Sequence, residues 1–169
     1  MTWGVQAQTF ETATEAVANM GVGWNLGNTL EAHSGSPNLP SSAAYWGVQG
    51  LESEVYWGQP YTTKEMITMM KDAGFGAIRV PVTWYNHMDA QGNVDSQWMA
   101  RVKEVVDYVI DNGLYCILNV HHDTGADSYQ SDGTTVKTVS WLKADRTYYN
   151  TYKDKYEYLW KQIATEFKD

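Results

Sequence analysis

Polar side chains that can bind ligands or support acid–base chemistry stand near the ends of three short apolar segments. Asn28 follows the first segment, Arg79 lies within the second, and Asn119 and His121 close the third. A guanidinium pairs with carboxylates, while amides and imidazoles both donate and accept hydrogen bonds. Each side chain also has a purely structural explanation, because a strand arginine can pair with a buried acid and a terminal amide can satisfy backbone groups. Their shared position at the ends of the segments favours a common site.

The histidines and the single cysteine give little support to metal chemistry. His33, His87, His121 and His122 form no His-x-His or His-Glu-x-x-His pattern, and neighbouring histidines on a strand point to opposite faces. Cys116 alone cannot build a thiolate site. No Gly-x-Ser-x-Gly elbow and no glycine-rich phosphate loop is present. We therefore expect neither a metal nor another cofactor.

Hydrophobic spacing and capping residues predict the elements that must carry these side chains. Thr12 and Glu15 form a capping-box pattern that predicts a helix over 12–20. Alternating apolar residues predict a strand over 22–28. Residues 31–60 have no periodicity, which is typical of a functional loop.

The middle of the chain continues this alternation of strands and helices. A second capping box predicts a helix that begins at Thr62, and a strand over 77–82 follows that Pro81 should interrupt. Asp95 is the predicted cap of a third helix. The nearly continuous apolar run 114–120 predicts a strand buried on both faces.

The order of elements predicts an α/β fold with a parallel sheet. A polar loop over 123–140 precedes a last helix, so the order is strand, helix, strand, helix, strand, helix. Strand side chains alternate between faces, which places Arg79, Asn119 and His121 on one face at the carboxyl end of the sheet. Barrel enzymes keep their chemistry at that end, and open doubly wound sheets bind ligands there too.

Composition and charge exclude some partners. The 169 residues, enough for one domain, include 20 acidic and 12 basic side chains, and the formal net charge of −8 argues against nucleic acid. No apolar run reaches the roughly 18 residues of a membrane span. The 12 tyrosines and 8 tryptophans far outnumber the 3 phenylalanines. Such rings suit flat, half-polar ligands such as sugars, although an aromatic-rich core explains them equally well.

Three segments of the chain resemble the opening strands of family 5 glycoside hydrolases. These segments are residues 21–32 (GVGWNLGNTLEA), 75–84 (FGAIRVPVTW) and 115–123 (YCILNVHHD). Three motifs in this order and spacing are highly specific, and the likeness spans nearly the whole chain. The resemblance is greatest to bacterial endo-β-1,4-glucanases, including the subgroup that accepts xyloglucan and mixed-linkage glucan.

The resemblance implies that residues 1–169 are the amino-terminal three βα units of a TIM (β/α)₈ barrel. The family cleaves with retention, using two glutamates about 5 Å apart that end later strands. The acid/base lies in an Asn-Glu-Pro motif, which this sequence lacks. We therefore expect both catalytic glutamates to lie outside this chain, and the chain alone to be inactive. The acids expected to be neither nucleophile nor acid/base are Glu31, Glu52, Glu54, Asp89, Asp123 and Asp127.

The resemblance also assigns roles to individual residues. Arg79 should sit behind the nucleophile and His121 should bind sugar hydroxyls where cleavage occurs. A second set should contact substrate elsewhere in the cleft, with the tryptophans as stacking platforms: Asn28, Glu31, His33, His87, His122, Trp46, Trp57 and Trp84.

Two other readings and two expectations about context accompany this one. The chain could be a non-catalytic sugar-binding or scaffold fragment, or part of a metal-dependent barrel hydrolase. The expected partners are a β-glucan and a second polypeptide that carries the remainder of the barrel. Residues 1–20 lack a signal-peptide pattern, so a secreted protein would be present here in its mature form.

Overall fold

The computed structural model describes residues 11–33, 50–89, 91–123, 128–129, 136–137, 141–142 and 146–168. Its α-helices are α1 (Ala13–Met20), α2 (Lys64–Asp72), α3 (Ser96–Asp111) and α4 (Arg146–Glu166). Two 3₁₀ helices are η1 (Gly50–Val55) and η2 (Tyr85–His87). The strands are β1 (Gly23–Asn25), β2 (Ala77–Val82), β3 (Tyr115–Val120), β4 (Ser128–Tyr129) and β5 (Val136–Lys137).

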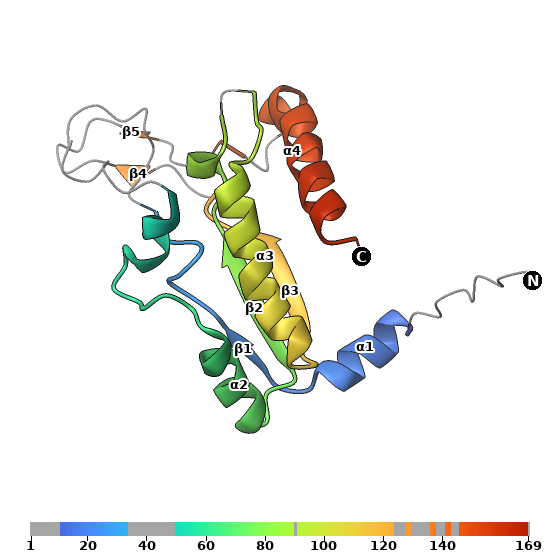
Figure 1. The fold of residues 1–169 in the computed structure, drawn as a ribbon. Helices are drawn as coiled ribbons and strands as arrows, with labels where there is room; N and C mark the ends of the chain where they lie inside the picture. Colours follow the sequence, from blue (N-terminus) through green and yellow to red (C-terminus); the bar gives the residue numbers. More distant parts are fainter. Residues whose placement is uncertain are drawn as a thin grey trace, which may run out of the picture.

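Strands β1, β2 and β3 form one parallel sheet in sequence order (Figure 1). Gly23 pairs with Ala77, which in turn pairs with Tyr115, so the three strands start level with one another. The connections between these strands contain α2 and α3, as parallel pairing requires. The α/β class and the parallel sheet are thereby confirmed, whereas β1 is shorter than the predicted strand 22–28.

Pro81 does not interrupt β2, which corrects the prediction. It occupies an ordinary register position opposite Asn119. Leu26 N donates to Arg79 O, and His121 N donates to Val82 O, so alternate residues of β2 direct their backbone groups toward β1 and β3. The missing N–H of Pro81 therefore lies on the side where β1 has already ended, and no ladder hydrogen bond is lost.

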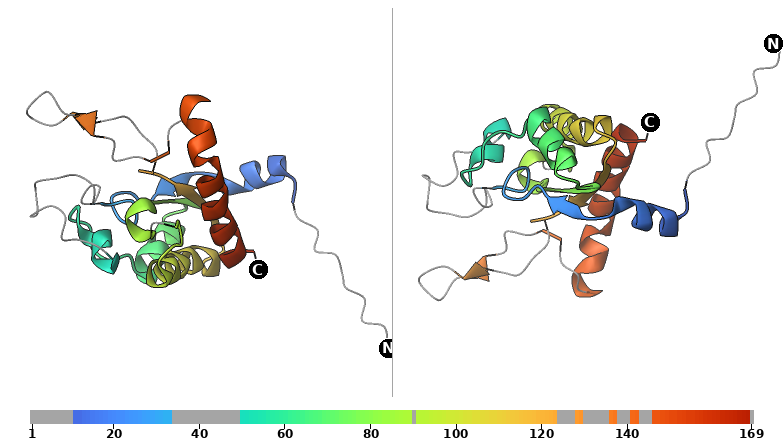
Figure 2. Two further views of the ribbon diagram at one scale, coloured as in Figure 1. Left: turned by 90° about the horizontal axis from the view of Figure 1, so that it is seen from above. Right: turned by 90° about the horizontal axis from the view of Figure 1, so that it is seen from below.

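The hydrophobic core lies between the sheet and helices α2 and α3, which cover one face (Figure 2). Ile78 and Val80 point to this face and are fully buried. The predicted inner face of α3 is buried throughout, and it consists of Trp98, Val102, Val105, Val106 and Val109. This face is called the outer face of the sheet below.

The opposite face of the sheet, here the inner face, is much more open. Ile117 keeps 43% of its surface exposed, Asn25 is exposed and Arg79 is only partly buried. The prediction that the third strand is buried on both faces is therefore wrong for the described residues. The apolar run of β3 reflects packing on one side and an uncovered surface on the other.

The capping predictions are confirmed for two helices and shifted for one. Thr12 and Glu15 form the capping box of α1, and Asp95 accepts from two backbone N–H groups at the start of α3. Helix α2, however, is capped by Thr63, whose side chain accepts from Met66 N. Thr62 is not the cap, because its backbone N–H is bound by the Glu54 carboxylate.

Helix α4 lies beside the edge of the sheet formed by β3 (Figure 1). Leu159 and Ile163 are its buried residues, and Gln162 fixes it to the preceding loop by accepting from Val94 N and donating to Gly92 O. None of the helices in the described part of the chain combines the length and apolarity needed to cross a membrane.

Candidate active site

Arg79 lies at the centre of a polar cluster built by all three parallel strands. Its Nη1 donates to Asn25 Oδ1 at 2.6 Å, and its Nη2 lies 3.2 Å from His121 Nδ1. Asn25 and Arg79 are register partners, so the sheet itself sets the first contact. Asn119 Nδ2 approaches the same imidazole nitrogen at 3.4 Å. The predicted convergence of Arg79, Asn119 and His121 on one face is thus confirmed.

The arginine also determines the tautomer of His121. A guanidinium can only donate, so His121 Nδ1 must accept from Arg79 Nη2 and the ring proton must reside on Nε2. The Asn119 amide presents a second donor to Nδ1, which is consistent with this assignment. His121 Nε2–H is therefore the donor nitrogen of this ring.

A cluster of aromatic rings adjoins His121 and extends the site beyond the sheet. The His121 and His122 ring centroids lie 4.4 Å apart, and His33 lies 5.0 Å from His122. Trp57 packs edge-on against His33 and His122 at 5.2 Å and 5.4 Å, and its Nε1 donates to His33 O at 3.1 Å. The Tyr85 hydroxyl lies 3.1 Å from His33 Nδ1. The structure thus brings together three predicted residues, His33, Trp57 and His122.

The pKa values of these histidines are lowered. Burial lowers the pKa of His33 to about 4, with a further contribution from His122. Burial is also the main cause for His121 and His122, followed by the charge of Arg79 for His121 and by His121 for His122. Near neutral pH the rings are therefore uncharged, and each has one donor and one acceptor nitrogen.

Glu31 organises a turn, which corrects its predicted contact with substrate. Its Oε1 accepts from Asn28 N at 2.6 Å and its Oε2 from Thr29 N at 3.0 Å, while only 4% of the residue is exposed. The carboxylate is therefore occupied by backbone groups. Asn28 adopts a φ of 63°, which asparagine tolerates better than most residues, and it remains exposed on this turn.

Two rings predicted to contact substrate are instead part of the core, namely Trp84 and His87. Trp84 is fully buried, and its backbone N–H donates to Asp123 Oδ2 at 2.7 Å. His87 is 4% exposed and stacks on Trp98 with a centroid distance of 3.6 Å. Burial lowers the pKa of His87 to about 3, so it is neutral. Both residues follow the end of β2, where the chain turns back over α3.

Sequence reasoning missed three residues around the site. Tyr85 contacts His33 but gave no signal beyond its position after the second motif. Asp123 is fully buried and accepts from Trp141 Nε1 at 2.6 Å, and burial raises its pKa to about 6 despite these hydrogen bonds. Glu54 is fully buried within the aperiodic segment and pairs with Arg101. Trp46 and Asp127 lie outside the described residues.

The described residues contain no group of three or more His, Cys, Asp or Glu that could hold a metal ion. Cys116 is partly buried on β3, and burial raises the pKa of its thiol to about 12. The thiol is therefore protonated at neutral pH and is a poor nucleophile.

Known proteins similar to this chain are bacterial endoglucanases. Endoglucanase A of Clostridium longisporum is 39% identical over 165 residues, which are 98% of this chain and 28% of that protein. Endoglucanase A of Ruminococcus albus is 40% identical over 94% of this chain and 36% of its own length. The chain therefore spans about a third of the length of these relatives.

Solved structures show the same similarity and the same partial coverage. A GH5-4 broad-specificity endoglucanase from an uncultured bacterium is 57% identical, with a TM-score of 0.80 over 96% of this chain and 40% of that one. A xyloglucan-specific family 5 endo-β-1,4-glucanase from a metagenomic library, in complex with cellotriose, is 36% identical, with a TM-score of 0.73 over 92% of this chain and 39% of its own. These neighbours agree with the three strands as an amino-terminal part of a family 5 barrel. Residues 38–169 also match the model of the cellulase family, and the chain therefore belongs to glycosyl hydrolase family 5.

Proposed function

We propose that this chain is the amino-terminal part of the catalytic domain of a retaining endo-β-1,4-glucanase. The proposed substrate is cellulose or another β-1,4-linked glucan, with xyloglucan and mixed-linkage glucan as further candidates. The observation that carries the proposal is the convergence of Asn25, Arg79 and His121 on the inner face at the carboxyl end of the sheet. Barrel enzymes carry out their reactions at that end.

Arg79 is proposed to support the nucleophilic glutamate of the completed barrel. A guanidinium beside a carboxylate favours the charged form and lowers its pKa, which keeps the nucleophile ionised for attack. Asn25 holds Arg79 in this orientation through the 2.6 Å hydrogen bond to its Nη1. In this role Arg79 prepares the reacting group and does not itself exchange a proton.

The histidine and tryptophan cluster is proposed to bind the glucan. His121 Nε2–H can donate to a sugar hydroxyl, because Arg79 occupies Nδ1. Trp57 keeps 37% of its surface exposed, which leaves ring area for a sugar to stack on. His33, His122 and Asn28 complete the proposed subsites.

The two catalytic glutamates are proposed to come from the carboxyl-terminal part of the barrel, as a second polypeptide or as the continuation of this one. In a retaining enzyme one glutamate attacks the anomeric carbon, while the other protonates the leaving oxygen and then activates water. Export of the protein follows from the polymeric substrate and is part of the same proposal.

The test measures hydrolysis of carboxymethyl-cellulose by three preparations. The first is this chain alone, and the second is the chain mixed with the carboxyl-terminal remainder of the relative that shares 57% identity. The third is a fusion of the two, called the completed enzyme below. Activity is expected from the fusion and from the mixture, and none from the chain alone.

Two outcomes would contradict the proposal. Hydrolysis by the chain alone would mean that its own acids are catalytic. An inactive completed enzyme that still binds cello-oligosaccharides in calorimetry would favour the scaffold reading, while loss of activity with a chelator would favour a metal-dependent hydrolase.

A further inference from the structure

The segment from Glu54 to Thr62 forms a loop that is closed at its base by a buried carboxylate. Glu54 is fully buried, and its Oε1 accepts from Thr62 N at 2.7 Å. Surface loops whose ends are tied in this way behave as compact units. Trp57, the exposed ring of the aromatic cluster, lies within this loop.

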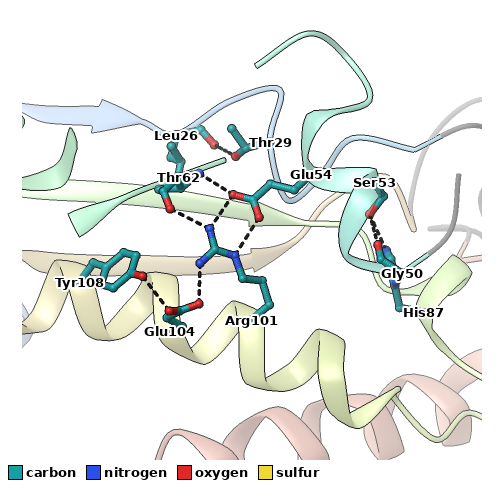
Figure 3. A network of polar contacts seen from close by, with 10 residues as sticks. All are labelled: Leu26, Thr29, Gly50, Ser53, Glu54, Thr62, His87, Arg101, Glu104 and Tyr108. Carbon is teal, nitrogen blue, oxygen red and sulfur yellow. Dashed lines mark hydrogen bonds and ion pairs between the residues drawn. The ribbon is translucent and has the colours of Figure 1, made fainter. Parts of the chain in front are cut away.

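A bidentate ion pair fixes the base of the loop to α3 (Figure 3). Arg101 donates through Nε to Glu54 Oε2 at 2.8 Å and through Nη2 to Glu54 Oε1 at 3.0 Å. The same Nη2 donates to Thr62 O at 2.7 Å, so one guanidinium holds both ends of the loop. The side chain of Arg101 is only 12% exposed. A planar fork of this kind restricts orientation as well as distance.

A second anchor lies one residue earlier. Ser53 is fully buried, and its hydroxyl donates to Gly50 O and lies 3.2 Å from His87 Nε2 (Figure 3). His87 is itself stacked on Trp98 of α3. Both anchors therefore connect the loop to the same helix.

Short turns transmit this placement from the anchors to Trp57. Tyr56 N donates to Ser53 O at 3.1 Å and Gly58 N donates to Val55 O at 3.0 Å, so Trp57 lies between two closed turns. Its indole N–H then reaches His33 O. The ring is thus fixed by the backbone on one side and by the site on the other.

We propose that Glu54, through Arg101, is a positioning residue that presents Trp57 to the glucan. This inference rests on the proposed function. It explains why a charged pair is buried in a segment without hydrophobic periodicity, since an apolar pair would not restrain the orientation of the loop. Glu54 touches no substrate in this account and acts only through the placement of the ring.

The test compares Glu54→Gln with a matched control, Glu104→Gln, in the completed enzyme. Both changes remove a carboxylate that accepts from Arg101, but the Glu104 side chain is 52% exposed. In Glu54→Gln the amide nitrogen faces the guanidinium donors, so the bidentate contact is lost. Loosening Trp57 is expected to raise KM for cello-oligosaccharides about tenfold, a loss of roughly 1.4 kcal/mol in affinity, with kcat within about twofold. Glu104→Gln should leave both constants within about twofold.

A double-mutant cycle distinguishes positioning from general stabilisation. In a Trp57→Ala background, Glu54→Gln should add less than about twofold to KM, because the ring it positions is already absent. An undiminished tenfold effect in that background would overturn the inference. Arg101→Lys keeps the charge but not the fork, and it should shift KM in the same direction if Glu54→Gln fails to fold.

A spectroscopic reading keeps this inference separate from the proposed function. The Trp57 indole N–H signal, identified by its disappearance in Trp57→Phe, should be protected from hydrogen exchange through its bond to His33 O. Glu54→Gln should reduce that protection and Glu104→Gln should not. Unchanged protection in Glu54→Gln would refute the positioning role even if the completed enzyme is active, and reduced protection in an inactive enzyme would refute only the glucanase proposal.

Discussion

The two faces of the parallel sheet differ more than any other pair of regions in this molecule. On the outer face Ile78 and Val80 are fully buried beneath α2 and α3. On the inner face the same strands present Asn25, Arg79 and the exposed Ile117. A single alternating backbone therefore carries a finished core on one side and a polar, open surface on the other.

This difference indicates which parts of the fold depend on the chain alone. The outer face obtains its burial from helices that the chain itself supplies. The inner face holds an arginine and a histidine oriented toward each other, together with an apolar residue in contact with water. It has the character of one wall of a barrel interior, whose remaining walls must come from additional strands.

The largest expected effect comes from the charge on the inner face. Arg79→Ala in the completed enzyme should lower kcat about a thousandfold or more, roughly 4 kcal/mol, because the nucleophile loses the charge that keeps it ionised. Steady-state kinetics on a soluble β-glucan measures this change. Ile78→Val on the outer face is the control and should leave kcat unchanged. A loss below about tenfold would make Arg79 a structural residue.

The next test concerns the apolar residues of the two faces. Ile78→Ala should cost about 2–5 kcal/mol in free energy of unfolding, since a buried side chain is replaced by a cavity. In the completed enzyme Ile117→Ala should cost more than about 2 kcal/mol, because added strands would bury it. Urea unfolding compares the two variants. A cost below about 1 kcal/mol for Ile117→Ala would mean that the inner face stays in water and is not a barrel interior.

The third test separates neighbouring residues that alternate between the two faces. His121→Ala should reduce kcat about a hundredfold, and His122→Ala about tenfold, because only the former ring contacts Arg79. Kinetics of the completed enzyme with a short aryl cellobioside reports the chemical step. If His122→Ala were the more damaging change, the assignment of faces would be reversed.

The smallest expected effect concerns Asp123, which follows β3. Burial raises the pKa of Asp123 from 3.8 to about 6, so the native state retains a proton that the unfolded chain releases. Its contribution to stability is therefore lost as the pH rises between these two values. Relative to Asp123→Asn, the completed enzyme should lose about 2 kcal/mol in free energy of unfolding between pH 4.5 and pH 7.5. Parallel curves for the two proteins would show that Asp123 does not titrate in this range.

The same two faces explain how far the sequence was informative. Periodicity predicted the buried stripe of α3, and strand alternation predicted the meeting of Arg79 and His121, because both patterns follow directly from backbone geometry. Trp84 and His87 were assigned wrongly because they lie just past the end of β2, where alternation no longer specifies a direction. Their burial depends on Asp123 and on Trp98, which are distant in sequence.

Glu54 shows a different kind of limit. It lies in a segment without periodicity, and its partner Arg101 is 47 residues away. A charged residue in such a segment is usually exposed, so its burial could not be inferred before the tertiary contacts were known. Pro81 is similar, because its tolerance in β2 depends on where β1 ends.

The central claim is that this chain supports a reaction whose two catalytic acids lie in another part of the barrel. It is tested most directly by trapping the glycosyl–enzyme intermediate of the completed enzyme with an activated 2-deoxy-2-fluoro-cellobioside and locating the label by peptide mass spectrometry. The account predicts one labelled glutamate in the carboxyl-terminal part and none within residues 1–169. A label on any carboxylate of this chain would contradict it.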